Sequence, residues 1–498
     1  MKVAFASPEL QSLVRRTNLA EVAEYLPRAL AGEGADVRVI LPYSQDIEQD
    51  KLSGLETLGT IRVSMGGEAA EEHELTLHRA RLGELQLVLL DHPTLFRERH
   101  PYGDGNGPYE DNWQRYAIFS RAFFEVLEKI DFTPDVIHCF DWTTGLIPVI
   151  HKLEHVGRKE CRTGRAGVFF SVNNVAIQGS FERSILPHIG LPHRLFQAIE
   201  GVELAGKVNF LKAGAEFATI VGTFSEGMVE RLQSIDRGDG LDDTFRRRTK
   251  ELVAVQNGID YATWDPETDP LLPQNFSASS KEPAGKKKCK SHLQTTLNLD
   301  PGTGKDRMPL IAVIGRFDAD SGFDVLGEAL TPLLERNLQL VLMGPAQEDI
   351  GERLRTIETT FAGRCRYLPG YHLNTAHALL GGADMLLLPA HSHATGALCA
   401  IAMRYGVSPI AYASSGLEDI ITNAETHPKN GTGFLFEHYS GESLIEAVDR
   451  ARGRFKKAAD WKPVVASCLA QDFSWQESAK SYIKAYRRVT RRVRGRKS

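Results

Sequence analysis

Two histidines two residues apart form the pattern in the sequence that most directly suggests a metal site. His391 and His393 can lie on the same face of an extended segment, and His372 and His377 stand in a connecting region upstream. A zinc or similar site needs further Cys, His or carboxylate ligands at matched spacing, and none accompanies this H-x-H pair. A solvated loop or an acceptor-site histidine is therefore favoured over a metal ligand.

Two other patterns suggest anion binding. The string DPGTGKD (300–306) resembles a phosphate loop, but Leu299 stands where that motif needs its first glycine and Asp306 where it needs a hydroxyl residue. The basic tail RRVTRRVRGRKS (487–498) could bind an anion, although a solvated helix end is the simpler interpretation. Neither pattern predicts a site by itself.

Composition and charge exclude several classes of protein. The chain has 498 residues, 42% of them hydrophobic and 25% charged, which is typical of a globular protein of two or three domains. With 59 basic and 64 acidic residues, the net charge of −5 gives no global attraction to nucleic acid or to a membrane. The six cysteines have no zinc or redox spacing, which indicates free thiols in a reducing compartment. Because no apolar run is long enough to span a membrane, we expect a soluble, cytoplasmic protein.

Short apolar runs alternate with helical segments, and these elements must position any site. The runs lie at 2–6, 36–41, 86–90, 135–138, 167–172 and 219–222, and then at 310–315, 338–344, 383–389 and 408–413. Strands that are apolar on both faces are typical of a parallel sheet covered by helices on both sides. The predicted fold class is therefore α/β, with two doubly wound, Rossmann-like domains whose ligands bind at the carboxyl ends of the strands.

A change in composition near Pro266 marks the division between the domains. Residues 267–308 are rich in Pro, Ser, Asn, Lys and Gly and have weak hydrophobic periodicity, so we interpret them as a polar inter-domain linker with some surface insertion. We assign 1–258 to an N-terminal domain and 259–474 to a C-terminal domain that carries this linker. Residues 475–498 are predicted to form a helix and basic tail that pack back on the N-terminal domain.

Strings spread over nearly the whole chain resemble the bacterial glycogen synthases and plant starch synthases. Among them are PDVIHCFDWTTGLIPV (134–149), NNVAIQGSF (173–181), GKVNFLKAG (206–214), NGIDYATWDPETDP (257–270) and QDFSWQESAKSYIKAY (471–486). The resemblance implies the GT-B architecture, in which two Rossmann-like domains face each other across a cleft. It also implies transfer of glucose from ADP-glucose, bound mainly by the C-terminal domain, to an α-1,4-glucan such as glycogen. No metal and no other cofactor is implied.

The chain departs from this family at positions in the N-terminal domain that are expected to bind substrate. The family's K-T-G-G-L loop reads RRTNL (15–19), so Arg15 keeps the positive charge, whereas the loss of two glycines hinders the approach of the backbone to a phosphate. The family's H-A-H-D-W-H reads HCFDWT (138–143), and its T-V-H-N-L-A-Y-Q-G reads SVNNVAIQG (171–179), so three histidines are replaced. The resemblance implies that the substrate-binding residues of this domain include Arg15, Arg16, Asp141, Asn174 and Gln178.

A second departure lies in the loop that would bind the donor diphosphate. The family's G-R-L-x-x-Q-K-G reads GRFDADSG (315–322), in which Arg316 is kept but Ser321 replaces the lysine. Asp318 and Asp320 add negative charge, which would repel a diphosphate if they face it. Loss of one charge-assisted contact costs about 1.5–3 kcal/mol, or roughly a ten- to hundredfold loss of affinity.

A third departure removes the glutamate that marks the family's site. The family's P-S-R-F-E-P-C-G-L-T-Q-L reads PAHSHATGALCA (389–400), with His393 in place of the glutamate and Gly396 kept, and Gly416 is kept from a later T-G-G-L. By resemblance, Arg316, Asp111 and His393 are the catalytic candidates, and Asn257, Gly396 and Gly416 join the substrate-binding set. Structural roles stay open: Asp111 could cap a helix, Asn257 could make a turn, and Arg316 could pair with a neighbouring aspartate.

Three hypotheses follow from these departures. The chain is a weakly active or inactive paralogue that binds glucan or regulates an active synthase, or it is an active retaining α-1,4-glucan synthase with a variant site. As a third possibility, Arg15, Arg16 and Arg316 bind another nucleotide sugar. Removal of a single electrostatic stabiliser often costs a hundred- to a thousandfold in rate. Several losses together therefore favour the first hypothesis, although such losses are not additive.

Overall fold

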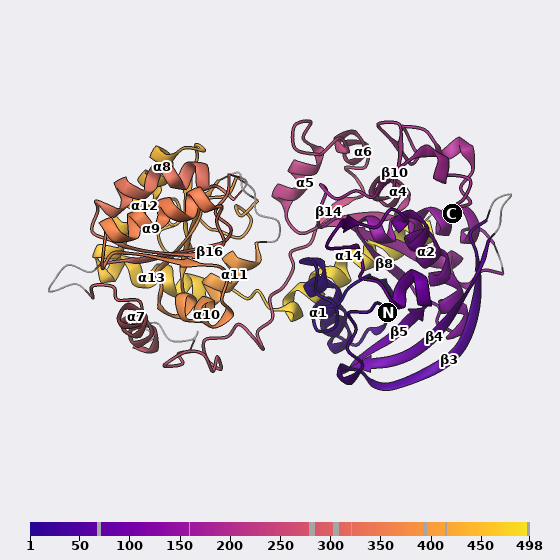
Figure 1. The fold of residues 1–498 in the computed structure, drawn as a ribbon, viewed down its shortest axis with the longest axis horizontal. Coiled ribbons are helices and arrows are strands. Elements are labelled where there is room, and N and C mark those ends of the chain that lie inside the picture. Colours follow the sequence, from indigo (N-terminus) through magenta and orange to yellow (C-terminus); the bar gives the residue numbers. More distant parts are fainter. Residues whose placement is uncertain are drawn as a thin grey trace. The chain divides into compact units, whose positions relative to one another are not determined.

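The computed structural model describes residues 1–66, 71–158, 160–277, 284–301, 308–319, 321–391, 396–413 and 416–495. The chain divides into two compact units: unit 1 comprises Met1–Gly258 and Trp475–Ser498, and unit 2 comprises Ile259–Ser474. In each unit, helices pack on both faces of a central sheet (Figure 1).

Unit 1 is built on a nine-stranded sheet with the order β14-β13-β9-β8-β1-β2-β5-β4-β3. Its strands are β1 (Lys2–Ala6), β2 (Asp36–Pro42), β3 (Ser53–Ser64), β4 (Glu72–Leu82), β5 (Leu85–Asp91), β8 (Val136–Phe140), β9 (Gly167–Ser171), β13 (Ile220–Thr223) and β14 (Leu252–Ala254). All neighbours from β14 to β5 pair in parallel, and the six apolar runs of this part of the chain form β1, β2, β5, β8, β9 and β13. The predicted parallel sheet is confirmed.

The long strands β3 and β4 at the edge of this sheet were not predicted (Figure 1). They pair antiparallel with each other, and β4 pairs antiparallel with β5. Buried and exposed residues alternate along most of β4, and β3 is exposed over much of its length. An antiparallel edge that is solvated on one face does not need a continuous apolar run, so a search for such runs overlooks it.

The alternation of side chains along β1 explains how helices cover both faces of the sheet. Val3 and Phe5 join one buried cluster, with residues of α1 (Leu19–Gly32) and α14 (Trp475–Gly495), whereas Ala4 and Ala6 join another. Successive residues of a strand point to opposite faces, so the two clusters are the cores on either side of the sheet. The second core is covered mainly by α2 (Asn112–Lys129), α3 (Leu146–Ile150), α4 (Phe210–Phe217), α5 (Glu226–Gln233) and α6 (Asp242–Arg247).

Unit 2 is built on a six-stranded parallel sheet with the order β17-β16-β15-β18-β19-β20. Its strands are β15 (Leu310–Ile314), β16 (Gln339–Gly344), β17 (Cys365–Pro369), β18 (Met385–Leu388), β19 (Ser408–Tyr412) and β20 (Phe434–Phe436). Figure 1 shows α8 (Phe323–Leu334), α9 (Glu348–Thr360) and α12 (Gly441–Lys456) on one face and α10 (Leu373–Gly382) and α11 (Ala397–Arg404) on the other. Helix α13 (Ala458–Leu469) packs against α11, α12 and β19.

The described residues of the segment predicted as a polar linker, 267–277, 284–301 and 308, belong to unit 2. Residues Ala284–Thr296 form α7, which packs against α10 and buries Cys289 and Leu293. Its buried Lys286 donates to the carbonyl oxygen of Tyr405 at 2.8 Å. The linker interpretation was wrong for this helix. Its many lysines make the composition polar, and the few buried side chains that pack it against unit 2 are too far apart in the sequence to form an apolar run.

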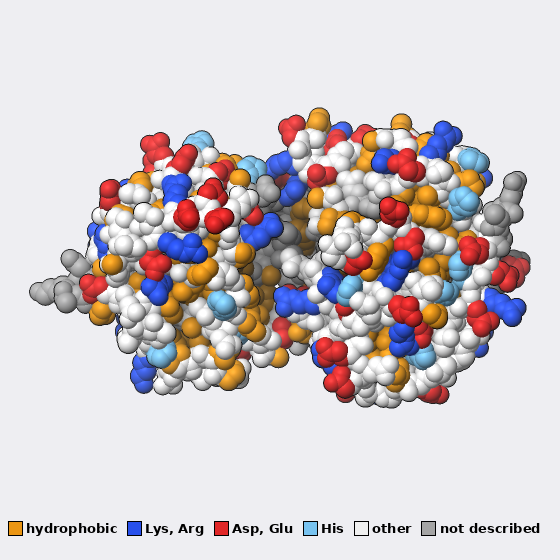
Figure 2. All heavy atoms as spheres, viewed as in Figure 1, with side chains coloured by type: hydrophobic (Ala, Val, Ile, Leu, Met, Phe, Trp, Pro, Cys, Tyr) orange, Lys and Arg blue, Asp and Glu red, His pale blue; other side chains and the backbone are white. Residues whose placement is uncertain are grey.

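Charged side chains of both signs are interspersed over the described surface visible in Figure 2, as the nearly balanced composition leads one to expect. Within the described ranges, no helix combines the length and apolar character needed to cross a bilayer.

Candidate functional site

Each central sheet contains the kind of switch point at which doubly wound folds bind ligands. In unit 1, β2 and β5 extend the sheet on one side of β1, and β8 and β9 extend it on the other. In unit 2, β16 and β17 lie on one side of β15, and β18 and β19 on the other. Loops diverge at the carboxyl ends of such neighbouring strands and leave room for a ligand. Four predicted site residues follow these strands: Arg15 and Arg16 after β1, Asp141 after β8 and Arg316 after β15.

A buried carboxylate, Glu9, organises the loop after β1. It accepts hydrogen bonds from the backbone N–H groups of Arg16 at 2.8 Å and Thr17 at 2.9 Å, and from the hydroxyl groups of Thr17 and Tyr102. Glu9 is fully buried, so these four donors replace the water that its carboxyl oxygens cannot reach. Glu9 was not predicted as a site residue, although an acidic residue just after an apolar first strand is a signal in the sequence.

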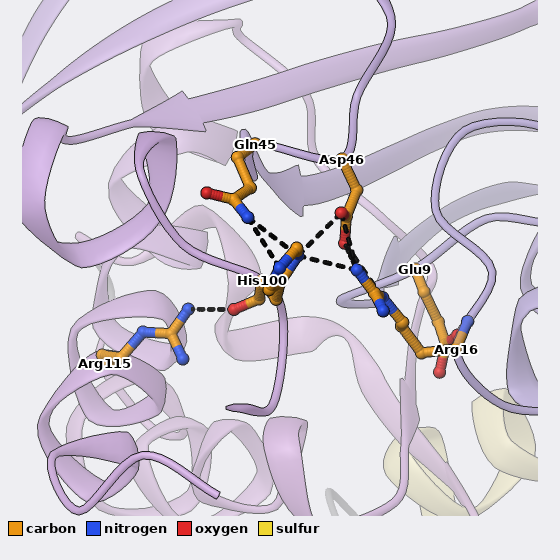
Figure 3. A network of polar contacts seen from close by, with 6 residues as sticks. All are labelled: Glu9, Arg16, Gln45, Asp46, His100 and Arg115. Carbon is orange, nitrogen blue, oxygen red and sulfur yellow. Dashed lines mark hydrogen bonds and ion pairs between the residues drawn. The ribbon is translucent and has the colours of Figure 1, made fainter. Parts of the chain in front are cut away.

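The guanidinium of Arg16 contacts side chains of unit 1 (Figure 3). Its Nε and Nη2 atoms reach the carboxylate of Asp46, with the shortest contact 2.7 Å from Nη2 to Oδ1. The Nδ1 atom of His100 lies 2.7 Å from both Arg16 Nη2 and Asp46 Oδ1. Gln45 Nε2 lies 2.7 Å from the other ring nitrogen of His100. Arg16, which was predicted to bind substrate, takes part in this network.

Arg15, the neighbour of Arg16 in the same loop, is exposed. Within the described parts of the chain, its side chain makes no hydrogen bond or ion pair. Of the two loop arginines, Arg15 is thus the one whose charge is open to an anionic ligand.

Asp141 lies immediately after β8 with a left-handed backbone, φ 51°. Its carboxylate accepts from the backbone N–H of Asn173 at 2.7 Å and of Asn174 at 3.3 Å. Burial raises the pKa of Asp141 to about 7, against the lowering effect of these hydrogen bonds. The strained backbone and the buried acid both lie at the carboxyl end of the central strands, as expected of a functional position.

Asn174 and Gln178, predicted to bind substrate, lie in the loop after β9. Asn174 is exposed and its Oδ1 accepts from the backbone N–H of Ala176 at 3.0 Å. Gln178 bonds to the carbonyl groups of Val175 and Asp239 and accepts from Asn209 Nδ2 at 2.6 Å, so its amide holds this loop to its neighbours.

Asp111 and Asn257 are held by other parts of unit 1. Asp111 precedes α2 but makes no capping hydrogen bond; its carboxylate instead contacts Arg99 Nη1 at 2.6 Å. Asn257 follows the edge strand β14 and accepts a hydrogen bond from Tyr482 of α14 at 2.9 Å. The Nδ2 atom of Asn257 is buried and has no hydrogen-bond partner. The capping role considered for Asp111 is thus not observed.

A pocket of about 300 Å³ lies at the switch point of unit 2. It is lined by the ends of β15 and β18 and by the residues that follow them, and among these lining residues Arg316 alone is charged. The Arg316 side chain is 69% exposed, and its Nε lies 3.3 Å from Asp318 Oδ2. Hydrogen bonding by Ser321 holds the pKa of Asp318 below its usual value, so this carboxylate is ionised beside the arginine. Asp320 lies outside the described residues.

The retained glycines of unit 2 have backbones that favour glycine. Gly396, the N-cap residue of α11, has φ 64°, and a Cβ atom there would lie 2.4 Å from Ile420 Cδ1. Gly416 has φ 87° and donates its N–H to Glu418 Oε2 at 2.9 Å. The family's glycines are thus kept where the backbone requires them, which is a structural reason independent of substrate.

The histidines of unit 2 have separate environments. His393 lies outside the described residues, and the exposed His391 ring packs 4.8 Å from the ring of Tyr439. We predicted that His377 lies in a connecting region, but it is buried in α10. Its ring stacks on Trp264, and its Nδ1 lies 2.8 Å from Asp269 Oδ2. In the described ranges, no three His, Cys, Asp or Glu side chains are grouped so as to hold a metal ion.

Family models match both parts of the chain. The model described as the starch synthase catalytic domain matches residues 2–247, and the model described as glycosyl transferases group 1 matches residues 298–463.

Curated relatives match the chain over almost its whole length. A protein of Geotalea uraniireducens named glycogen synthase is 34% identical over 98% of this chain and 98% of its own. A protein of Geobacter sulfurreducens named glycogen synthase 2 is 33% identical over 99% of this chain and 100% of its own.

Solved structures match over the same extent. The catalytic domain of starch synthase IV from Arabidopsis thaliana, bound to ADP and acarbose, superposes with a TM-score of 0.82 and 27% identity over 98% of this chain and 99% of that one. Sucrose-phosphate synthase from Thermosynechococcus elongatus, with a TM-score of 0.57 and 15% identity over 98% of each chain, shares the fold. The predicted GT-B fold class is confirmed.

Proposed function

The chain belongs to the family of bacterial glycogen synthases and plant starch synthases, and from this premise we propose that it is a member whose glucosyl transfer is strongly weakened. Its substrates are a nucleotide sugar, with ADP-glucose as the first candidate, and an α-glucan such as glycogen. The ADP and acarbose bound to the related starch synthase IV structure support these two substrate classes. If transfer is absent, the function that we propose is to bind glucan or to regulate an active synthase.

The pocket of unit 2 is the observation that carries this proposal. Cleavage of a nucleotide sugar leaves a diphosphate, and donors aimed at its developing charge supply much of the rate enhancement in such a site. Here Arg316 is the pocket's charged residue among those described, and Asp318 lies 3.3 Å from its guanidinium. Ser321 stands where the family has a lysine, and its backbone N–H donates to Asp318 Oδ1 at 2.8 Å. One partly neutralised arginine is a weak binding site for a diphosphate.

In unit 1, the loop after β1 points to the same conclusion. The backbone N–H groups of Arg16 and Thr17 donate to Glu9, so neither is free to donate to a phosphate. The Arg16 side chain is held by Asp46. The loop thus offers a ligand the side chain of Arg15 and few other donors.

A second candidate function is that of an active retaining α-1,4-glucan synthase. The exposure of Arg15 and of Arg316 favours it, because two cations remain open to a diphosphate. The two candidates differ in the rate of transfer and not in the fold.

The proposal is tested by restoring the missing cation. In the double variant Asp318→Asn/Ser321→Lys, a lysine returns and the competing carboxylate is removed, so we expect ADP to bind about ten- to a hundredfold more tightly. Release of ADP from ADP-glucose with glycogen as primer should rise in parallel. The matched control Asp318→Asn/Ser321→Gln has a side chain of similar length without charge. If both variants bind ADP equally, the loss of this cation does not explain a weak site.

A further inference from the structure

The arginine network of unit 1 has a geometry that separates the roles of its two arginines. Arg16 is 43% exposed, yet two nitrogen atoms of its guanidinium contact the Asp46 carboxylate, which is 18% exposed. A planar guanidinium matches a carboxylate through paired contacts, so this arrangement fixes orientation as well as charge. Arg15, one residue away, has no such partner among the described residues.

The partners of Arg16 come from loops that follow neighbouring strands. Asp46 and Gln45 follow β2, and His100 follows β5 after a short turn (Figure 3). The backbone of His100 is itself fixed, because the buried Arg115 donates Nη2 to its carbonyl oxygen at 2.8 Å. The network therefore ties the loop after β1 to a rigid part of unit 1.

The ring of His100 lies between the side chains of Arg16 and Asp46. Arg16 can only donate and ionised Asp46 can only accept, so the Nδ1 atom that lies 2.7 Å from both serves one of them at a time. The Nε and Nη2 atoms of Arg16 also donate to the Asp46 carboxylate. Asp46 and His100 therefore both contact the Arg16 guanidinium.

We propose that Asp46 and His100 are positioning residues that anchor Arg16 and thereby hold the loop that presents Arg15 to an anionic ligand. Glu9 holds the backbone of this loop through the N–H groups of Arg16 and Thr17. The side-chain network supplies a second anchor. That the ligand is the diphosphate of a nucleotide sugar rests on the function proposed above.

Backbone hydrogen exchange tests the anchor without reference to any reaction. In Asp46→Asn, the N–H groups of Arg16 and Thr17 should exchange about three- to tenfold faster than in the unchanged protein, as loss of a partly exposed ion pair predicts. The control Asp50→Asn removes the same charge from an exposed position nearby, and the loop should exchange as before. The exchanged pair Arg16→Asp/Asp46→Arg should restore part of the protection. Unchanged exchange in Asp46→Asn would overturn the proposal.

Binding of ADP then distinguishes positioning from competition. If Asp46 positions the loop, Asp46→Asn should bind ADP about three- to tenfold more weakly, at an unchanged melting temperature, and Arg15→Gln should lose at least as much. Tighter binding of ADP in Asp46→Asn would show that Asp46 masks Arg16 from the ligand. Equal binding would show that the anchor does not help the loop to present Arg15. Either result overturns the proposal. If the unchanged protein binds no ADP, the proposed function fails, whereas hydrogen exchange still decides whether the anchor exists.

Discussion

Asp141 is a buried acid whose protonation ties the stability of unit 1 to pH. The pKa of its carboxyl is about 7 in the folded chain, against 3.8 in the absence of burial. Between these values the folded state binds more protons than the unfolded state, so the free energy of unfolding falls as the pH rises from about 4 to about 7. Above pH 7 both states are ionised and this contribution is constant.

Asp141→Asn should therefore stabilise the protein at pH 8 and have a smaller effect at pH 5. The amide stays neutral, and its oxygen can still accept the N–H of Asn173, which now lies 2.7 Å from the carboxylate. We expect a rise in melting temperature of a few degrees at pH 8, measured by calorimetry. Asp50→Asn, at an exposed position, should show no such pH dependence. Equal shifts of Asp141→Asn at both pH values would contradict the assigned ionisation.

At this scale, the sequence identifies which residues follow the strands but not what holds their side chains. The family's first loop predicts that Arg15 and Arg16 act alike, whereas Arg16 is tied to Asp46 and His100, which lie 30 and 84 residues further along the chain. Two further contacts were likewise not predicted: that of Glu9 with the loop after β1, and that of Arg99 with Asp111. These contacts depend on the order of strands in the sheet, which the spacing of residues in one sequence does not encode.

Helix α14 is the element that joins the end of the chain to the core of unit 1. Its Tyr486 lies against β8 and β9, with its hydroxyl group 2.6 Å from His138 Nδ1, and the other ring nitrogen lies 2.8 Å from Ser171 Oγ. Burial holds the pKa of His138 well below its usual value, so the ring is neutral. This histidine, kept from the family's H-A-H string, thus supports the packing of α14.

Tyr486→Phe should destabilise unit 1 by about 1–3 kcal/mol, because it leaves a buried ring nitrogen without its partner. Chemical denaturation monitored by circular dichroism measures this change. Arg491→Ala, on the exposed side of the same helix, should alter stability by less than about 0.5 kcal/mol. Equal effects of the two substitutions would mean that α14 is not held through this contact.

Among the elements, the continuous apolar runs were predicted well, whereas several elements that are only partly apolar were not. The runs at 310–315 and 408–413 correspond closely to β15 and β19, since a strand buried on both faces is apolar throughout. Strands β3 and β4 and helix α7 were missed because each buries only part of its surface and carries many polar residues.

For the molecule as a whole, the family relationship extends over 98% of the chain, and the proposed loss of activity concerns the loops at the two switch points. The scaffold keeps a relative's fold at a TM-score of 0.82. Buried strands and the glycines with positive φ tolerate little change because packing and backbone geometry constrain them. Loops carry the chemistry and are free to lose it without loss of the fold. Membership in the family therefore predicts the architecture of this chain, whereas the rate of transfer depends on the residues of these loops.

The rate of nucleoside diphosphate release tests the central claim most directly. Pure protein is incubated with glycogen primer and either ADP-glucose or UDP-glucose, and the released diphosphate is measured over time. Because each missing stabiliser costs a hundred- to a thousandfold, we predict fewer than about 0.01 turnovers per second, together with retention of the protein on a glucan affinity gel. Turnover at about one per second or faster, as in ordinary enzymes, would contradict the account and establish the chain as an active synthase.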